Sequence, residues 1–284
     1  MSYLNTDSQL AIIGKEGIVD PGYNINLGEV TSTEDFINVF SNREKGDDHF
    51  WVNAIFRDHP SHKVGLRFVK NGGRPVFLYL VGNQSNTFTG DVIVEGQAVV
   101  DFVKGGGARG ANGNLFASNG GTIGVGLSNQ ISSKSHMNLR NRGRFVIWGL
   151  GSITSDTVQS LKKLTVDEGR GVVEFSRLYN HDRRFLYLDD LMIADGAGLD
   201  IRGWEEGFSY LLVRKDSKHL ADALKKITFD GYLPGRVHLE DFNKDYWQIS
   251  GTPEPATYGA IFAGAGVGLI VWRRRRWCGR ARAE

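Results

Sequence analysis

Hydrophobic and polar residues alternate in short runs along most of the chain up to Gly251. The runs are rich in β-branched and aromatic side chains, and Gly, Asn and Asp separate them. Alternation with a period of two is typical of half-buried β-strands, because successive side chains point to opposite faces. The clearest runs cover residues 77–81, 92–94, 98–103, 122–127, 144–148, 172–175 and 185–188. The body of the protein is therefore predicted to be mostly β.

A polar turn leads into a strand at two places about one solenoid rung apart. Asn86-Thr87-Phe88-Thr89-Gly90 precedes the run 91–96, and Asn119-Gly120-Gly121 precedes the run 122–125. Repeats that bury each strand against the next rung form a quasi-linear β-helix. We expect residues 83–175 to stack parallel strands, and an antiparallel sandwich is the alternative. Four side chains are expected to point inward: Val92, Val94, Ile123 and Val125.

One segment has a persuasive helical pattern. Leu220, Leu224 and Ile227 recur at helical spacing, and Ser217 can cap the first turn. Lysines stand near the C-terminal end, where they complement the helix dipole. The sequence therefore predicts one short helix in an otherwise β-rich body.

The C-terminal residues have the properties of a membrane segment. Seventeen residues from Ala256 to Trp272 carry no charge, and as a helix they would extend about 26 Å. Tyr258 and Trp272 suit the membrane interface, and Gly264 and Gly268 have small-residue spacing. The cluster that follows would stay on the cytoplasmic side and orient the body outward: Arg273, Arg274, Arg275 and Arg276.

Charge is unevenly distributed along the chain. The formal net charge is +2, but six arginines and one glutamate follow Trp272, so the rest of the chain carries a net charge of −3. A mildly acidic body argues against a nucleic-acid-binding protein. Glycine contributes 37 residues, which favours tight turns, and the single cysteine, Cys278, cannot form an internal disulfide.

The C-terminal segment resembles a PEP-CTERM sorting signal. The resemblance rests on Pro253, Glu254 and Pro255, on the apolar run and on the arginine cluster, in that order. It covers about 30 residues, and it implies export, membrane retention and processing near the motif by an exosortase. The partners implied are the exosortase, the export machinery and the membrane. An exopolysaccharide is a further candidate partner.

The segment 83–175 is similar to autotransporter-associated β-strand repeats, with Phe88 in the aromatic position of the turn. This similarity implies a right-handed parallel β-helix. The residues between Tyr187 and Trp247 look like a closing module that covers the last rung. The expected fold is therefore an all-β, right-handed parallel β-helix with a capping β module that contains one short helix, followed by a C-terminal transmembrane helix. The expected divisions are 1–82, an N-terminal β segment; 83–180, the β-helix; 181–250, the closing module; and 251–284, the sorting signal.

The N-terminus departs from this family pattern. Residues 1–8 have no basic region, and residues 10–13 are too few for the apolar part of a signal peptide. Either the start lies upstream or the product is a decayed, non-exported copy. We favour a truncated start, because an outward-facing sorting signal needs export.

Three apparent chemical motifs fit ordinary turns better than sites. Gly105, Gly107 and Gly110 match a dinucleotide fingerprint, but no helix or acidic ribose ligand follows. The acidic turn 241–245 lacks the glycine and glutamate of a calcium loop. His59 and His62 have no evident third zinc ligand. The sequence predicts no cofactor and no metal.

The enzymatic alternative is a polysaccharide-cleaving β-helix, which would need paired carboxylates. Candidates by residue type are Asp189, Asp190, Asp195 and Asp200, although turn chemistry explains this run as well. The favoured interpretation is a non-catalytic spacer or adhesive surface protein, tethered in the cell envelope with its body outside the cytoplasm, and released to the surface after processing.

Overall fold

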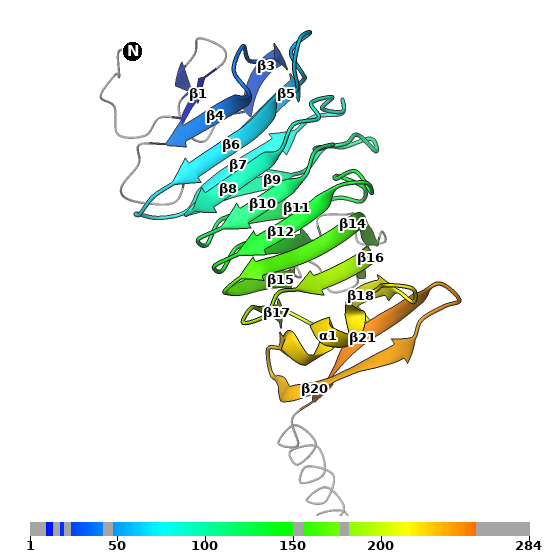
Figure 1. Cartoon of the computed structure of the whole chain (residues 1–284). Helices are drawn as coiled ribbons and strands as arrows, with labels where there is room; N and C mark the ends of the chain where they lie inside the picture. The colour runs from blue at the N-terminus through cyan, green and yellow to red at the C-terminus, as the bar shows by residue number, and fades with distance from the viewer. Residues whose placement is uncertain are drawn as a thin grey trace, which may run out of the picture.

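The chain winds into a parallel β-solenoid of about seven turns. The computed structural model describes residues 10–13, 18–19, 24–41, 48–149, 156–176 and 182–253. Figure 1 shows the coil from the side, with the first strands at one end and an antiparallel hairpin at the other.

Two sheets make up the walls of the solenoid. Sheet A contains, in spatial order, β2 (Ile18–Val19), β1 (Leu10–Ile13), β4 (Phe36–Ser41), β6 (Gly65–Lys70), β8 (Val92–Gly96), β10 (Leu115–Ser118), β12 (His136–Arg140), β14 (Thr157–Glu168), β16 (Arg184–Ile193), β18 (Ser209–Arg214), β21 (Tyr246–Pro253) and β20 (Tyr232–Asp241). Sheet B contains β19 (Ile227–Phe229), β17 (Gly198–Arg202), β15 (Arg170–Ser176), β13 (Arg144–Trp148), β11 (Thr122–Val125), β9 (Ala98–Phe102), β7 (Val76–Val81), β5 (Asp48–Phe56) and β3 (Asn24–Val30).

From β3 to β19, successive strands alternate between the two sheets, so each turn adds one strand to each sheet. All pairs in sheet B are parallel, and so are the pairs of sheet A from β4 to β18. This confirms the predicted parallel stacking over 83–175 and excludes the antiparallel sandwich there. The right-handed sense of the coil stays a prediction.

The core is continuous along the inside of the coil. Val92 and Val94 in β8, and Ile123 and Val125 in β11, are fully buried, as the alternation predicted. Strands one rung apart place these side chains in register, since Leu115 and Ala117 of β10 pair with Val92 and Val94. Each rung therefore buries its apolar side chains against its neighbours, which is the main source of stability for a solenoid.

Buried amide side chains join consecutive rungs where the chain turns. Asn86 accepts a hydrogen bond from the backbone N–H of Phe56 and donates one to the carbonyl of Gly110. Gln130 bonds both backbone groups of Lys104 in the preceding turn, and Gln159 bonds both those of Ile131. Backbone groups at these corners would otherwise be buried without partners. The asparagine of the first predicted turn thus connects three rungs.

Glycines at the next corner allow neighbouring rungs to approach closely. A Cβ on Gly121 would overlap the carbonyl of Val94, and a Cβ on Gly143 would overlap that of Ala117. Both glycines precede a strand of sheet B at the same place in successive turns. Some of the glycines are therefore required by the short distance between neighbouring rungs, in addition to those that allow tight turns.

Replacement of Gly143 by alanine is expected to destabilise the fold by about 1–3 kcal/mol, because the methyl group must push two rungs apart. Urea denaturation measures this change in the free energy of unfolding. Lys134→Ala, at an exposed turn, is the control and should stay within about 0.5 kcal/mol of the wild type. Equal stability of the two variants would contradict the close-approach argument.

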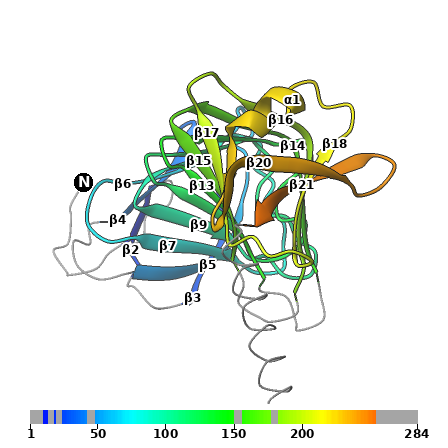
Figure 2. The same cartoon turned by 90° about the horizontal axis from the view of Figure 1, so that it is seen from below.

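An antiparallel hairpin covers the C-terminal end of the coil. β21 pairs with β18 on one side and with β20 on the other. In Figure 2, seen from below, β20 lies across the end of the coil. Tyr232, Val237 and Leu239 of β20 pack against the core. The hairpin therefore covers both the edge of β18 and the end of the core.

The predicted helix is present but shorter than expected. α1 (Leu220–Ala223) continues as the 3-10 turn η1 (Leu224–Lys226), and Ile227 already begins β19. Ile227 pairs with Leu199 in sheet B, so tertiary pairing ends the helical pattern. Ser217 does not cap the helix, because its hydroxyl donates to Asp190 and the N-cap residue is His219.

Parallel pairing crosses the first two of the three predicted boundaries. β7 pairs with β9 across residue 82, and β14 pairs with β16 across residue 180. The strands β16, β17, β18 and β19 of the predicted closing module thus continue the solenoid, whereas β20 and β21 form the antiparallel hairpin. In the part of the chain that the structure describes, no helix is long and apolar enough to cross a membrane.

Candidate functional site

Of the predicted sorting residues, Pro253 alone lies among the residues that the structure describes. Pro253 is the last residue of β21 and pairs with Tyr232. The others lie outside the described residues: Glu254, Pro255, Ala256, Tyr258, Gly264, Gly268, Trp272, Arg273, Arg274, Arg275 and Arg276. The hairpin therefore delivers the chain directly to the start of the Pro-Glu-Pro motif.

Each of the four candidate aspartates has its own basic partner. Nζ of Lys162 lies 2.9 Å from Asp189, and Nζ of Lys163 lies 3.5 Å from Asp190. The other two ion pairs join Asp195 to Lys226 and Asp200 to Arg170. The structure thus places these carboxylates in separate ion pairs between neighbouring turns, where they contribute to the alignment of the rungs.

The pKa values of Asp190, Asp195 and Asp200 are unsuited to a general acid. Burial raises the pKa of Asp190, but the hydrogen bonds from Ser217 and His219 outweigh burial and the net pKa is lowered. The pKa of Asp200 is lowered in the same way by Arg170 and Thr228, against burial. A hydrogen bond from Lys226 lowers the pKa of Asp195. A catalytic acid at neutral pH needs the opposite shift.

The other apparent metal motifs form hydrogen-bonded turns. Oδ1 of Asn243 accepts from the backbone N–H groups of Asp245 and Tyr246, and so closes the turn between β20 and β21. His59 and His62 both bond the hydroxyl of Ser61. Within the described ranges, no group of three or more potential metal ligands occurs.

Aromatic and charged side chains follow one another across the strands on the outer face of sheet B. At its N-terminal end the rings of Trp51 and Tyr79 stack with centroids 5.0 Å apart, and those of His49 and Phe77 with centroids 4.6 Å apart. These rings stack on one another from rung to rung, so one face of each ring is occupied by its partner. The aromatic stack therefore stabilises the ladder more than it offers a platform for a ligand.

A buried carboxyl group follows the aromatic stack. Asp101 of β9 is 2% exposed and pairs in register with Gly124 of β11. Because Gly124 has no side chain, Nε1 of Trp148 reaches across it to donate to Asp101 at 2.9 Å. Burial raises the pKa of Asp101 to about 7, and the bond from Trp148 opposes this rise. Burial and the charge of Asp101 also raise the pKa of Tyr79 to about 12.

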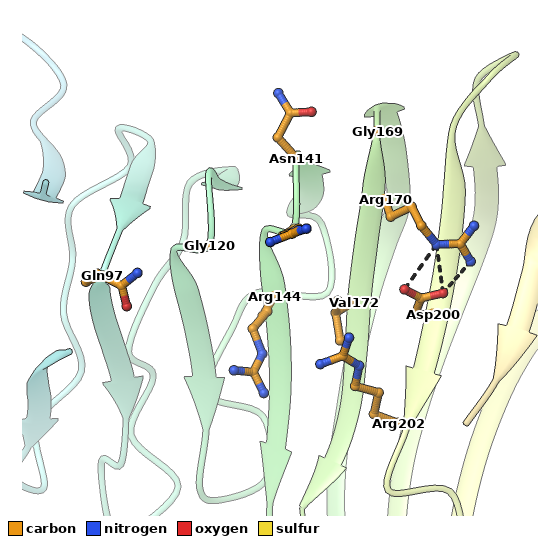
Figure 3. A pocket seen from close by; sticks show the side chains of 10 residues that line it. Gln97, Gly120, Asn141, Arg144, Gly169, Arg170, Val172, Asp200 and Arg202 are labelled. Atoms are coloured by element: carbon orange, nitrogen blue, oxygen red, sulfur yellow. Dashed lines mark hydrogen bonds and ion pairs between the residues drawn. The ribbon is translucent and has the colours of Figure 1, made fainter. Parts of the chain in front are cut away.

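Towards the C-terminal end, the same face opens into an arginine-rich groove of about 760 Å³. We call it the arginine groove, and it is lined by Gln97, Gly120, Asn141, Arg142, Arg144, Gly169, Arg170, Val172, Asp200 and Arg202. Figure 3 shows these residues on consecutive turns. A smaller hollow of about 190 Å³, lined in part by Phe77, Thr122 and Trp148, shares Gln97, Gly120 and Arg144 with it.

Two of the four arginines are paired and two are not. Nε of Arg170 donates to Asp200 at 2.9 Å, and Arg144 forms an ion pair with Glu174. Arg142 and Arg202 are exposed, and their guanidinium groups form no ion pair with any described residue. Two carboxylates against four guanidinium groups leave an excess of two positive charges. The groove can therefore attract an anion.

Alternation and turn motifs did not single out these arginines. A signal was present in the repeat itself, since Asn141-Arg142-Gly143-Arg144 repeats the turn Asn119-Gly120-Gly121-Thr122 with arginine at two positions. Aligning the two turns would have revealed both residues. No family model matches the chain, and neither the curated proteins nor the solved structures contain a significant match to it.

Proposed function

We propose that the protein is an exported, membrane-tethered bacterial surface protein, sorted by its C-terminal signal and processed by an exosortase. Its β-solenoid acts as a non-catalytic spacer or adhesive module, with an exopolysaccharide matrix as its surroundings. The observation that carries the proposal is that β21, which closes the solenoid, ends at Pro253, the first residue of the motif that resembles the sorting signal.

The arrangement at this end suits a tethered body. β21 is held between β18 and β20, so the last described strand is anchored in the fold up to the motif. A proline on each side of Glu254 disfavours helix and favours an extended backbone there. A short extended stalk between a closed body and a membrane helix would leave the motif accessible at the membrane surface.

The chemistry of the body supports a non-catalytic role over the glycan-cleaving alternative. Asp189, Asp190, Asp195 and Asp200 are each engaged by a lysine or an arginine. Asp101 has the raised pKa of a potential acid, but it is buried and does not line the arginine groove. An inverting or retaining glycosidase needs two carboxylates that face the same bond.

Reporter fusions test the topology that the proposal requires. With a functional signal peptide supplied, a phosphatase that is active only after export should be active when it is fused after Pro255, beyond the end of β21. The same reporter fused after Glu284 should be inactive, because Arg273 to Arg276 hold that end in the cytoplasm. A cytoplasmic fluorescent reporter should give the reverse pattern.

The control is a variant in which all four arginines of the cluster are replaced by glutamine. We expect this variant to lose the fixed orientation of the C-terminal fusion, because the positive charge sets it. Activity of the phosphatase after Glu284 in the unmodified chain, or its absence after Pro255, would contradict the proposal.

A further inference from the structure

Two equivalent turns of the solenoid differ in a way that points to a ligand. Ser118 pairs with Arg140 and Thr122 pairs with Arg144, so the three-residue turns 119–121 and 141–143 occupy the same place in successive rungs. The first turn reads Asn-Gly-Gly and the second Asn-Arg-Gly. Gly120 is thus replaced by Arg142, and Thr122 by Arg144, on the side that faces the arginine groove.

Arg142 holds an unfavourable backbone conformation. Its φ is +69°, and that of Asn141 is +44°, so both residues are left-handed. Asparagine tolerates this region and glycine prefers it, whereas arginine does not. In the preceding turn, Asn119 and Gly120 adopt the same pair of conformations with the residues that suit them. An exposed, unpaired arginine at a strained position is a reason to look for a function there.

The other unpaired arginine comes from a different strand. Arg202 of β17 pairs in register with Glu174 of β15, and Glu174 bonds Arg144 of β13. In Figure 3, Arg144 and Arg202 extend over the sheet on either side of Val172, whereas Arg170 turns to Asp200. Since strands lie about 4.8 Å apart, β13 and β17 are about 10 Å apart. Arg144 and Arg202 therefore reach towards β15 from the strands on its two sides.

We propose that the arginine groove binds an acidic polysaccharide of uronic acid residues that runs obliquely across β13, β15 and β17. Arg142 and Arg202 contact its carboxylates, and Arg144 contributes a third guanidinium group beside them. Arg142 lies at the level of Arg170 and Gly198, whereas Arg202 lies four residues further along β17, so the chain of sugars crosses the strands obliquely. This inference rests on the adhesive role in the proposed function and names its ligand class.

The mixed chemistry of the groove favours a uronic acid polymer over a nucleic acid. Glu174 and Asp200 stand among the arginines, and they accept hydrogen bonds from sugar hydroxyls but repel a continuous row of phosphates. Gln97 and Asn141 add neutral polar groups at the edges of the groove. The chain preceding the C-terminal arginines has a net charge of −3, which opposes non-specific binding of a polyanion.

The test compares polymers that share a backbone but differ in charge. The full-length protein, purified in detergent micelles, is titrated with polygalacturonate, with its fully methyl-esterified form and with single-stranded oligothymidylate. We expect binding of polygalacturonate only, and weaker binding as salt increases. Binding of the neutral ester, or equal binding of oligothymidylate, would overturn the assignment.

A matched pair of double variants locates the site. Arg142→Gln with Arg202→Gln removes the two unpaired charges, and we expect Kd for polygalacturonate to rise at least roughly tenfold. Arg109→Gln with Lys134→Gln removes two exposed charges outside the groove and should leave Kd within roughly twofold. Equal Kd values for the two double variants would overturn the proposal.

A single substitution separates binding from folding. Arg142→Gly restores the turn of the preceding rung, so we expect the midpoint of thermal unfolding to stay the same or rise while the affinity for polygalacturonate falls. If Arg142 served only the structure, Arg142→Gly would lower the midpoint of thermal unfolding and leave the affinity for polygalacturonate unchanged. Because the binding assay requires no export, loss of binding with the expected reporter topology refutes only this inference. Binding with the wrong topology refutes only the proposed function.

Discussion

Asp101→Asn is expected to stabilise the protein above pH 7 by up to about 4 kcal/mol and to leave its stability unchanged near pH 4. The carboxyl group of Asp101 is buried beneath Trp148 and beside Tyr79, and its pKa is raised from 3.8 to about 7. A shift of one pKa unit corresponds to about 1.4 kcal/mol. An asparagine has nearly the same shape, and its carbonyl oxygen can still accept the bond from Trp148.

The sign follows from proton binding in the two states. Between pH 3.8 and about pH 7, the folded chain retains the proton on Asp101 and the unfolded chain loses it. The contribution of this group to stability is therefore complete below pH 3.8, falls steadily as pH rises and is lost above about pH 7. The asparagine variant has no such dependence, so the difference between the two proteins should grow across this range.

Urea denaturation of both proteins at several pH values from 4 to 8.5 measures this difference. Asp200→Asn is the matched control on the same sheet, because the pKa of Asp200 is lowered and the opposite trend is expected. That variant should be less stable than the wild type at neutral pH, and the gap should close as the solution becomes acidic. A constant difference between Asp101→Asn and wild type across the range would show that Asp101 is not held protonated.

The strands of the solenoid could be predicted from the sequence because their signal is local. Alternation placed Val92, Val94, Ile123 and Val125 inside, and all four are buried. The recurrence of a polar turn before a strand predicted parallel stacking, because a single rule applied to every rung. The end of the helix could not be predicted in this way, since Ile227 leaves helical geometry to pair with Leu199, which lies 28 residues away.

The roles of the candidate site residues could not be predicted from the sequence, because they depend on contacts between rungs. Asp189 and Asp190 looked like candidates for paired catalytic groups, but Lys162 and Lys163 of the preceding turn engage them. On a solenoid, the side chain that contacts a given residue lies one turn away. The number of residues between the two depends on the register of the strands. The hydrogen bond that Asp101 accepts from Trp148 likewise depends on residues of the next two strands of sheet B, because Gly124 leaves room for it. Residue type along one strand carries no information on such groups.

Cleavage at the sorting motif is expected to remove the whole membrane segment from the protein. In a host that carries the matching exosortase, we expect the mature protein to lose the span from Ala256 to Trp272 and the arginines that follow. A double variant with Pro253→Ala and Pro255→Ala should remain full-length and bound to the membrane. Intact-mass measurement of the surface and membrane fractions distinguishes these products. The prediction rests on the resemblance to the sorting signal and on the extended backbone that the two prolines favour.

A second pair of prolines provides the control. Pro60→Ala with Pro75→Ala changes two prolines of the solenoid body, far from the motif in the sequence, and should be processed like the wild type. Surface protein that retains its sequence through Glu284 would contradict the sorting proposal and would leave the C-terminal segment as a simple anchor.

The position of the cut has a structural consequence that can be measured on the released body. Since β21 remains paired with β20 up to Pro253, cleavage after this residue leaves the closing hairpin complete. Ile249 of β21 is fully buried and pairs with Leu211 of β18, so the hairpin covers the last rung. We therefore expect the released body to unfold at the same temperature as the full-length protein. A cut within β21 would expose the edge of β18 and the end of the core, and it would lower this midpoint.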